Sequence, residues 1–346
     1  MQIKLLIPCL LMFVSSLTPG LTAPLRVVTT LPDYAFIAKA IGGERVEVEA
    51  IVRGEQDAHY IRPKPSFVNM VRRADVLIDT GLDLEMWLPT VVDKSGNTKV
   101  RGGQPGYVAV SSGLELLEKP KTFSRSEGGV HVYGNPHITS SPVNMRTVAR
   151  NIAIGLTKND PAGKDYYREH AEAFVRELDD RMFGKVLVDM LGGDTLADLA
   201  SRGALYSFLE KKTLENQPLL ESLGGWSRQM LPLRGRQIVT YHKNWVYFFK
   251  LFDLAEAGTV EPKPGIPPSP NHVLALTEKM RSQGINILLA ANYFDEQQIR
   301  MVAERAGAEP VIVPLYAGGA PGTDSYFDLV NLWVSSLLKA AGSQSK

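Results

Sequence analysis

The 346-residue chain has almost no cysteine. Its single cysteine, Cys9, lies within the first 23 residues, and the rest of the chain has none. A disulfide framework is therefore excluded, and so is a zinc or iron–sulfur site built from cysteine thiolates. Any metal site in this chain has to use histidine, aspartate, glutamate or water as ligands.

An excess of charge of one sign is also missing. The chain has 38 basic and 37 acidic residues, which gives a formal net charge of +1. This balance provides no electrostatic footprint for nucleic acid or for an anionic membrane surface. The composition is otherwise that of an ordinary globular protein, and the length predicts two domains.

The apolar run near the amino terminus is too short to cross a membrane. It extends from Leu5 to Val14, about ten residues, whereas a membrane-spanning helix needs ~20. Lys4 precedes the run and Leu21-Thr22-Ala23 follows it, which is the layout of a secretory signal peptide cleaved after Ala23. Cys9 lies inside the run behind a proline, which argues against lipidation. Without Lys4 the basic residues number 37, so the exported chain is neutral.

The sequence signatures of common enzymes are absent. We find no metalloprotease H-E-x-x-H, no hydrolase G-x-S-x-G, no G-x-x-x-x-G-K-[ST] phosphate loop and no dinucleotide-binding G-x-G-x-x-G. Residues 318–322 are rich in glycine, but Pro321 and the missing lysine favour a flexible loop over a phosphate site. We therefore expect a protein that is not an enzyme.

Strand-like and helix-like segments alternate along the chain. The expected strands are 25–30, 46–52, 75–80, 237–240, 285–290 and 311–313. The expected helices are 33–41, 66–74 with Ser66 as N-cap, 83–92, 244–252, 273–283, 295–306 with Asp295 as N-cap, and 325–341. This alternation predicts βαβ units and a mostly parallel sheet in each half. Residues 195–236 have a leucine-rich helical pattern whose place in the fold the sequence does not give.

A long helical pattern separates the two halves. It extends from Pro161, which follows Asp160 as N-cap, to about Leu191, before two glycines. One helix of ~31 residues would be about 46 Å long, longer than a small domain. We expect it to cross both lobes as a linking helix, and the alternative is two helices broken at Gly184.

Three histidines lie where an α/β protein binds ligands. His59 and His242 come just after expected strands, and His137 leads into a helix that begins near Pro142. Loops beyond the carboxyl ends of parallel strands form ligand sites, and three neutral imidazoles suit zinc. Taken singly, each is more typical of a turn or surface histidine. His170 and His272 fit solvated helix positions, and His131 would line the mouth of the site or support a ligand.

An ordered set of motifs gives the chain a recognisable pattern. The set comprises Val27-Val28-Thr29-Thr30, His59-Tyr60 with Arg62-Pro63-Lys64-Pro65-Ser66, Ala74-Asp75-Val76-Leu77, Gly81-Leu82-Asp83-Leu84-Glu85 with Trp87-Leu88, Gly134-Asn135-Pro136-His137, Tyr241-His242-Lys243-Asn244-Trp245 with Tyr247-Phe248, and Thr323-Asp324-Ser325-Tyr326. In this order the chain resembles the cluster A-I solute-binding proteins of ABC importers for zinc and manganese. The resemblance implies two α/β lobes joined by a long backbone helix, with a metal site in the cleft between the lobes.

The resemblance also implies a ligand set. The family's metal ligands fall on His59, His137 and His242, and a histidine at the third position favours zinc over manganese. Many members add an aspartate near the position of Pro314, where this chain has no carboxylate, and a glutamate where it has Ala291-Asn292-Tyr293. The fourth position is then open to water, a small anion or an unidentified carboxylate.

Taken together, these observations predict a periplasmic, monomeric solute-binding protein. It would capture Zn²⁺ and deliver it to an ABC permease of the inner membrane, with no nucleic-acid partner. The alternatives are a manganese or iron protein of the same family, and an exported zinc hydrolase with Glu85 as a candidate base. The expected organisation is a signal peptide (1–23), an amino-terminal lobe (24–158), a linking helix (159–193) and a carboxyl-terminal lobe (194–346).

Overall fold

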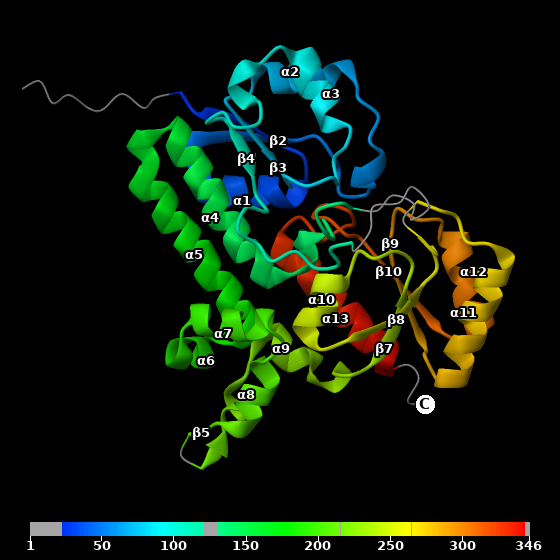
Figure 1. Ribbon diagram of the computed structural model, residues 1–346. Helices are drawn as coiled ribbons and strands as arrows, with labels where there is room; N and C mark the ends of the chain where they lie inside the picture. Colours follow the sequence, from blue (N-terminus) through cyan, green and yellow to red (C-terminus); the bar gives the residue numbers. More distant parts are fainter. Residues whose placement is uncertain (1–22, 121–130, 215, 264, 343–346) are drawn as a thin grey trace, which may run out of the picture.

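The computed structural model describes residues 23–120, 131–214, 216–263 and 265–342 (Figure 1). They form two α/β lobes, each built on a four-stranded sheet, and this confirms the expected fold class. None of the helices in these ranges is long and apolar enough to span a membrane. The expected signal peptide, with Cys9, lies outside the described residues except for Ala23.

The sheet of the amino-terminal lobe is entirely parallel. Its order is β2-β1-β3-β4, and the strands are β1 Leu25–Thr29, β2 Val46–Ala50, β3 Val76–Asp79 and β4 Tyr107–Ala109. All four residues of β3 are buried, as expected for a central parallel strand covered on both faces. The sequence did not predict β4, which is only three residues long.

Proline marks the starts of the helices in this lobe. They are α1 Pro32–Gly42, α2 Pro65–Arg73, α3 Leu88–Ser95 with Pro89 in its first turn, and α4 Pro142–Asn159. Ser66 as N-cap is wrong, because Lys64 occupies the N-cap position and Pro65 is the first helical residue. The expected helix from Asp83 begins only at Leu88, and the carboxylate of Asp83 instead holds the loop that carries His131.

The single linking helix expected from Pro161 to Leu191 is broken, and the alternative break at Gly184 is what the structure has. A short turn, Pro161–Gly163, precedes α5 Lys164–Phe183, and α6 Lys185–Leu191 follows Gly184. Gly184 has a φ of +82°, and a Cβ there would lie 2.6 Å from the Cα of Gly224. The close approach of the Gly224 backbone therefore requires glycine and ends α5.

The segment after the linking helix, which the sequence left unplaced, consists mainly of short helices. These are α7 Gly193–Ser201, α8 Leu205–Lys211 and α9 Gly225–Met230, with the two-stranded β5 Thr213–Leu214 and β6 Gln217–Pro218 between the last two. Helix α5 contacts α1 at one end and α7 and α9 at the other. The helix therefore links the amino-terminal lobe to this segment, which lies below it in Figure 1.

The carboxyl-terminal lobe repeats the parallel architecture. Its sheet has the order β10-β9-β7-β8, and the strands are β7 Gln237–Thr240, β8 Ala255–Thr259, β9 Ile287–Ala291 and β10 Glu309–Val313. Helices α11 Pro270–Gln283 and α12 Glu296–Ala306 cover one face, and α10 Val246–Phe252 and α13 Tyr326–Gly342 lie on the other (Figure 1). Asp295 caps α12 as expected. The sequence did not predict β8.

Two apolar cores support these layers. The larger is continuous from the amino-terminal lobe through α4 and α5 to the face of the second sheet that carries α10 and α13. Trp245 and Trp333 meet edge to face within it, with ring centroids 5.2 Å apart. The smaller core fills the space between the second sheet and helices α11 and α12. Because the larger core is continuous, shared apolar contacts connect the two lobes.

Candidate metal centre

His59 is positioned by the aspartate two residues before it. It lies in a helical turn, Ala58–Tyr60, that follows β2. The Asp57 carboxylate accepts a hydrogen bond from the backbone N–H of His59 at 2.9 Å and lies 2.7 Å from its Nδ1. Burial raises the pKa of Asp57, but the hydrogen bonds from His59 outweigh burial and leave that pKa below its usual value. An ionised carboxylate only accepts, so Nδ1 carries the hydrogen and Nε2 presents its lone pair.

His137 is held from both lobes. It precedes the turn Ile138–Ser140, and α4 then begins with Ser141 as its cap. Asn135 Oδ1 accepts from the backbone N–H of His137 at 3.0 Å, and Asn135 Nδ2 donates to the carbonyl of Lys243 at 2.8 Å. The imidazole is 1% exposed, and neither ring nitrogen has a hydrogen-bond partner. Buried polar atoms are almost always paired, so this ring lacks the partner that a bound cation would supply.

His242 follows β7 and is paired with a carboxylate of its own. Its Nδ1 lies 2.7 Å from Oε2 of Glu261, and both side chains are largely buried. Glu261 reaches this position because β7 and β8 run parallel, and its backbone N–H donates to the carbonyl of Tyr241 at 2.9 Å. As at His59, the carboxylate directs the Nε2 lone pair of His242 away from itself.

The three histidines that the sequence selected converge in space. One ring nitrogen from each can be chosen so that all three atoms lie within 4.8 Å of one another. The ring centroids of His59 and His137 are 5.0 Å apart, those of His137 and His242 5.4 Å, and those of His59 and His242 5.7 Å. Carboxylates are not part of this group of three.

Electrostatics keeps the two most buried rings neutral. Burial, followed by the neighbouring rings of His59 and His242, lowers the pKa of His137 well below its usual value. Burial also lowers the pKa of His242, although the hydrogen bond to Glu261 acts in the opposite direction. Metal ions bind neutral imidazole, so these rings are ready to act as ligands without first losing a proton.

The other histidines divide into one near the cluster and two elsewhere. His131 Nε2 lies 3.3 Å from Nε2 of His59, and its Nδ1 lies 2.9 Å from Oδ1 of Asp83. His170 bonds to the carbonyl of Tyr166 within α5, and His272 bonds to the carbonyl of Thr259. His131 is therefore at the site, as expected from its sequence position, whereas the other two pair with backbone carbonyls.

Glu85, the candidate base of a hydrolase, is engaged elsewhere. Its Oε1 accepts hydrogen bonds from the hydroxyls of Thr30 at 2.6 Å and Thr80 at 2.7 Å. The side chain is buried, and burial raises its pKa. These contacts fit a residue that ties β1 to β3 rather than one that activates water.

The carboxylates at the centre are residues that sequence reasoning did not single out. Asp57, Asp83 and Glu261 each face a histidine Nδ1. The short spacing of Asp57 and His59 carried a signal for the first of them. Asp83 and Glu261 are 48 and 19 positions away from their histidines, and no local pattern connects them.

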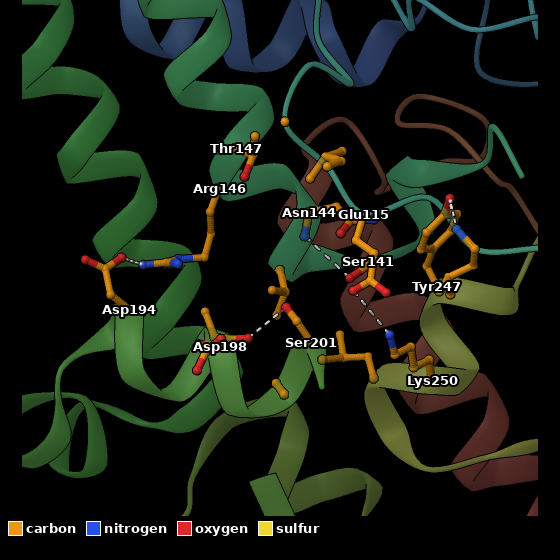
Figure 2. A pocket seen from close by; sticks show the side chains of 17 residues that line it. Glu115, Ser141, Asn144, Arg146, Thr147, Asp194, Asp198, Ser201, Tyr247 and Lys250 are labelled. Carbon is orange, nitrogen blue, oxygen red and sulfur yellow. Dashed lines mark hydrogen bonds and ion pairs between the residues drawn. The ribbon is translucent and has the colours of Figure 1, made fainter. Parts of the chain in front are cut away.

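A separate polar cavity of about 270 Å³ lies between α4, α7 and α10 (Figure 2). Arg146 in its wall pairs with Asp194 at 2.5 Å, and Lys250 lies 3.9 Å from Glu115. Its described lining contains no histidine. Tyr247 lines it and donates its hydroxyl to the carbonyl of Asn135 at 2.6 Å, so this wall supports the segment that carries His137.

The sequence of this chain is similar to those of a known protein family. Residues 27–182 and 210–340 match the model of the family described as zinc-uptake complex component A, periplasmic. The manganese ABC transporter substrate-binding lipoprotein PsaA of Streptococcus pneumoniae is 24% identical over 315 residues, covering 88% of this chain and 85% of that protein. The iron ABC transporter substrate-binding lipoprotein MtsA of Streptococcus pyogenes serotype M1 is 24% identical over 319 residues, covering 88% and 85%.

A solved structure has the same fold. It is a zinc-bound ZnuA with residues 138–173 of its own sequence deleted. It aligns with a TM-score of 0.67 at 19% identity, over 92% of this chain and 98% of that one. At this identity the likeness bears on the fold and leaves the choice of metal to the donor atoms of this chain.

Proposed function

Because the chain belongs to the family of periplasmic zinc-uptake components, which are metal-binding substrate-binding proteins of ABC transporters, we propose that its cargo is Zn²⁺. We propose His59, His137 and His242 as ligands of that ion. The observation that carries this proposal is their convergence, with ring nitrogens within 4.8 Å of one another. The buried, unpartnered ring of His137 adds to it.

The donor set favours zinc over manganese, the metal named for one of the two streptococcal relatives. PsaA and MtsA are named for manganese and iron, and this chain shares the family with both. Manganese favours carboxylate, carbonyl and water oxygens, whereas imidazole suits zinc. Here the nearby carboxylates of Asp57 and Glu261 are directed at imidazole nitrogens, which leaves a nitrogen-rich centre.

The proposed ligands come from both lobes, so the bound ion would connect one lobe to the other. His59 and His137 belong to the amino-terminal lobe, and His242 follows β7 of the other. Direct contacts already join the lobes here: Asn135 Nδ2 to the carbonyl of Lys243, and Tyr326 Oη to the carbonyl of Thr139 at 2.7 Å. An ion held between the lobes would stabilise one relative orientation, and a permease could recognise that orientation.

The remaining assignments follow from this role. We propose that residues 1–23 are an export signal and that the mature protein works in the periplasm as a monomer, delivering the ion to a permease of the inner membrane. We also propose lobes at 24–158 and 194–346, connected by 159–193. No catalytic step is required of any residue in this role.

Metal competition on the stripped protein tests the proposal. The chelator-treated chain is offered equal amounts of zinc, manganese, iron(II) and copper, and is then analysed by native mass spectrometry and elemental analysis. We expect one zinc per chain, and we expect it to be lost in His59→Ala, His137→Ala and His242→Ala. His170→Ala and His272→Ala, which alter histidines paired with backbone carbonyls, should retain it.

Three other outcomes would redirect the assignment. Retention of manganese or iron in preference to zinc would leave the family role and change the cargo. Metal retained at full stoichiometry in all three ligand variants would place the site elsewhere. Turnover of ester or peptide substrates by the zinc-loaded chain would support a zinc hydrolase instead.

A further inference from the structure

We propose that His131 is the fourth ligand of the cargo ion, so that the centre is made of four imidazoles. This rests on the proposed function, because it adds a ligand to the same site. The fourth position would then be filled by the protein rather than by water, a small anion or a carboxylate.

The first argument comes from the hydrogens on the two rings. His59 Nδ1 faces the carboxylate of Asp57, and His131 Nδ1 faces that of Asp83. Each carboxylate accepts, so each Nδ1 carries the hydrogen and each Nε2 carries a lone pair, as assigned from these partners. The two Nε2 atoms nevertheless lie 3.3 Å apart. Two lone pairs at that distance repel, and a cation that contacts both atoms turns the repulsion into attraction.

The second argument is the distance itself. Zinc binds imidazole nitrogen at about 2.0–2.1 Å, so two nitrogens at a tetrahedral angle are about 3.3 Å apart. The Nε2 atoms of His59 and His131 already have this separation. The positions of the two rings lead to the same conclusion. The ring centroids of His59 and His131 are 5.3 Å apart, and two imidazoles bound to one zinc ion at a tetrahedral angle would have centroids about 5.2 Å apart.

The third argument is that hydrogen bonds to Asp83 hold His131 in position. Asp83 Oδ1 lies 2.9 Å from its Nδ1, and Asp83 Oδ2 accepts from the backbone N–H of Val132 at 2.7 Å. The side chains of His131 and Asp83 are 13% and 15% exposed, close to the 15% of His59. A carboxylate behind a largely buried imidazole is the arrangement found behind metal-bound histidines.

His131 stands at the edge of the three-histidine group rather than within it. Its ring centroid lies 6.1 Å from that of His137, about 1 Å more than an ideal tetrahedral pair. Binding therefore requires a shift of this order in the segment that leads from residue 131 to residue 137. Two carboxylates at the centre, Asp57 and Glu261, could take the fourth position only by leaving the histidine nitrogens that they orient.

Counting imidazoles on the bound ion tests the assignment. X-ray absorption of the zinc-loaded chain should report four nitrogen ligands with imidazole scattering, and three in His131→Ala. We expect His131→Ala to bind zinc ~10–100-fold more weakly than the wild type. Removing a residue that hydrogen-bonds to a ligand costs this much affinity, and removing a ligand should cost at least as much. Free imidazole should restore part of the affinity by occupying the space left by the ring. His170→Ala should match the wild type in all three measurements.

The outcomes separate this inference from the proposed function. If the wild type binds one zinc through three imidazoles and an oxygen ligand, or if His131→Ala retains four imidazoles and full affinity, His131 is not a ligand and the zinc-capture role stands. If the wild type binds no zinc, the proposed function itself fails. In Asp83→Asn, which keeps the ring and weakens its anchor, four imidazoles should remain with lower affinity.

Discussion

Nδ1 of His242 lies 2.7 Å from Oε2 of Glu261, and this contact joins the end of β7 to the residues that follow β8. It fixes which nitrogen of His242 carries the hydrogen and therefore which nitrogen can bind a cation. The same pairing recurs at His59 with Asp57 and at His131 with Asp83. His137 is the exception: Asn135 holds its backbone, and its ring has no hydrogen-bond partner.

Replacing the carboxylate behind His242 should weaken metal binding without removing the site. Glu261→Gln keeps an oxygen acceptor for Nδ1 but removes its charge, so we expect a ~10–100-fold loss of zinc affinity at unchanged stoichiometry. Titration against a competing chelator measures this loss. Glu256→Gln is the matched control, since the Glu256 carboxylate accepts a hydrogen bond from the hydroxyl of Thr240 instead. Equal affinity of Glu261→Gln and the wild type would contradict the orienting role.

A single Cβ at Gly134 should disturb the segment between His131 and His137. Gly134 has a φ of +115°, and an added Cβ would lie 2.8 Å from the carbonyl oxygen of Leu117. We expect Gly134→Ala to cost about 1–3 kcal/mol of folding free energy from the backbone conformation alone. It should also lower zinc affinity, because the carbonyl contact pushes the segment away.

The control for that variant separates strain from displacement. Gly103 also has a positive φ, +83°, but a Cβ there would meet nothing within 4 Å. Gly103→Ala should therefore lose stability in urea unfolding while binding zinc like the wild type. If the two alanine variants have the same zinc affinity, the position of the segment from residue 131 to residue 137 does not depend on Gly134.

Asp33, at the start of α1, should make stability fall as pH rises. It is fully buried, and neither carboxyl oxygen has a hydrogen-bond partner. Burial raises its pKa to about 7, although the backbone N–H groups of Asp33 and Ala317 lie near enough to oppose this. The unfolded value is about 3.9, so the folded state holds the proton more tightly. Its contribution is favourable below pH ~4 and is lost between pH ~4 and ~7.

Neutralising that side chain should remove this pH dependence. Asp33→Asn should gain stability relative to the wild type as pH rises from 5 to 8, by about 3 kcal/mol at most. Urea unfolding of both proteins at each pH measures the difference. Asp165→Asn, at an exposed position of α5, should show no such trend. A constant difference between Asp33→Asn and the wild type across this range would show that Asp33 does not titrate there.

Much of the fold could be predicted from the spacing of apolar residues and from the capping residues, prolines and glycines at the ends of elements. The alternation of apolar strands with capped helices gave the parallel sheet of each lobe, and Asp295 was correctly identified as a cap. The failures lie where tertiary contacts decide. Strand β4 has only three residues, the loop around Asp83 is held by His131, and α5 ends where the backbone of Gly224 approaches Gly184.

The sequence by itself determined the chemistry available to the site. A chain with no cysteine after residue 9 can offer no thiolate ligand, and histidines after strands indicated where nitrogen ligands would gather. Their convergence within 4.8 Å agrees with that prediction, and their role as ligands stays a prediction. Only the tertiary structure decided which carboxylate faces which ring and that His131 lies beside His59. The reason is physical: spacing along the chain reports local geometry, whereas these contacts join loops that only the parallel pairing of strands brings together.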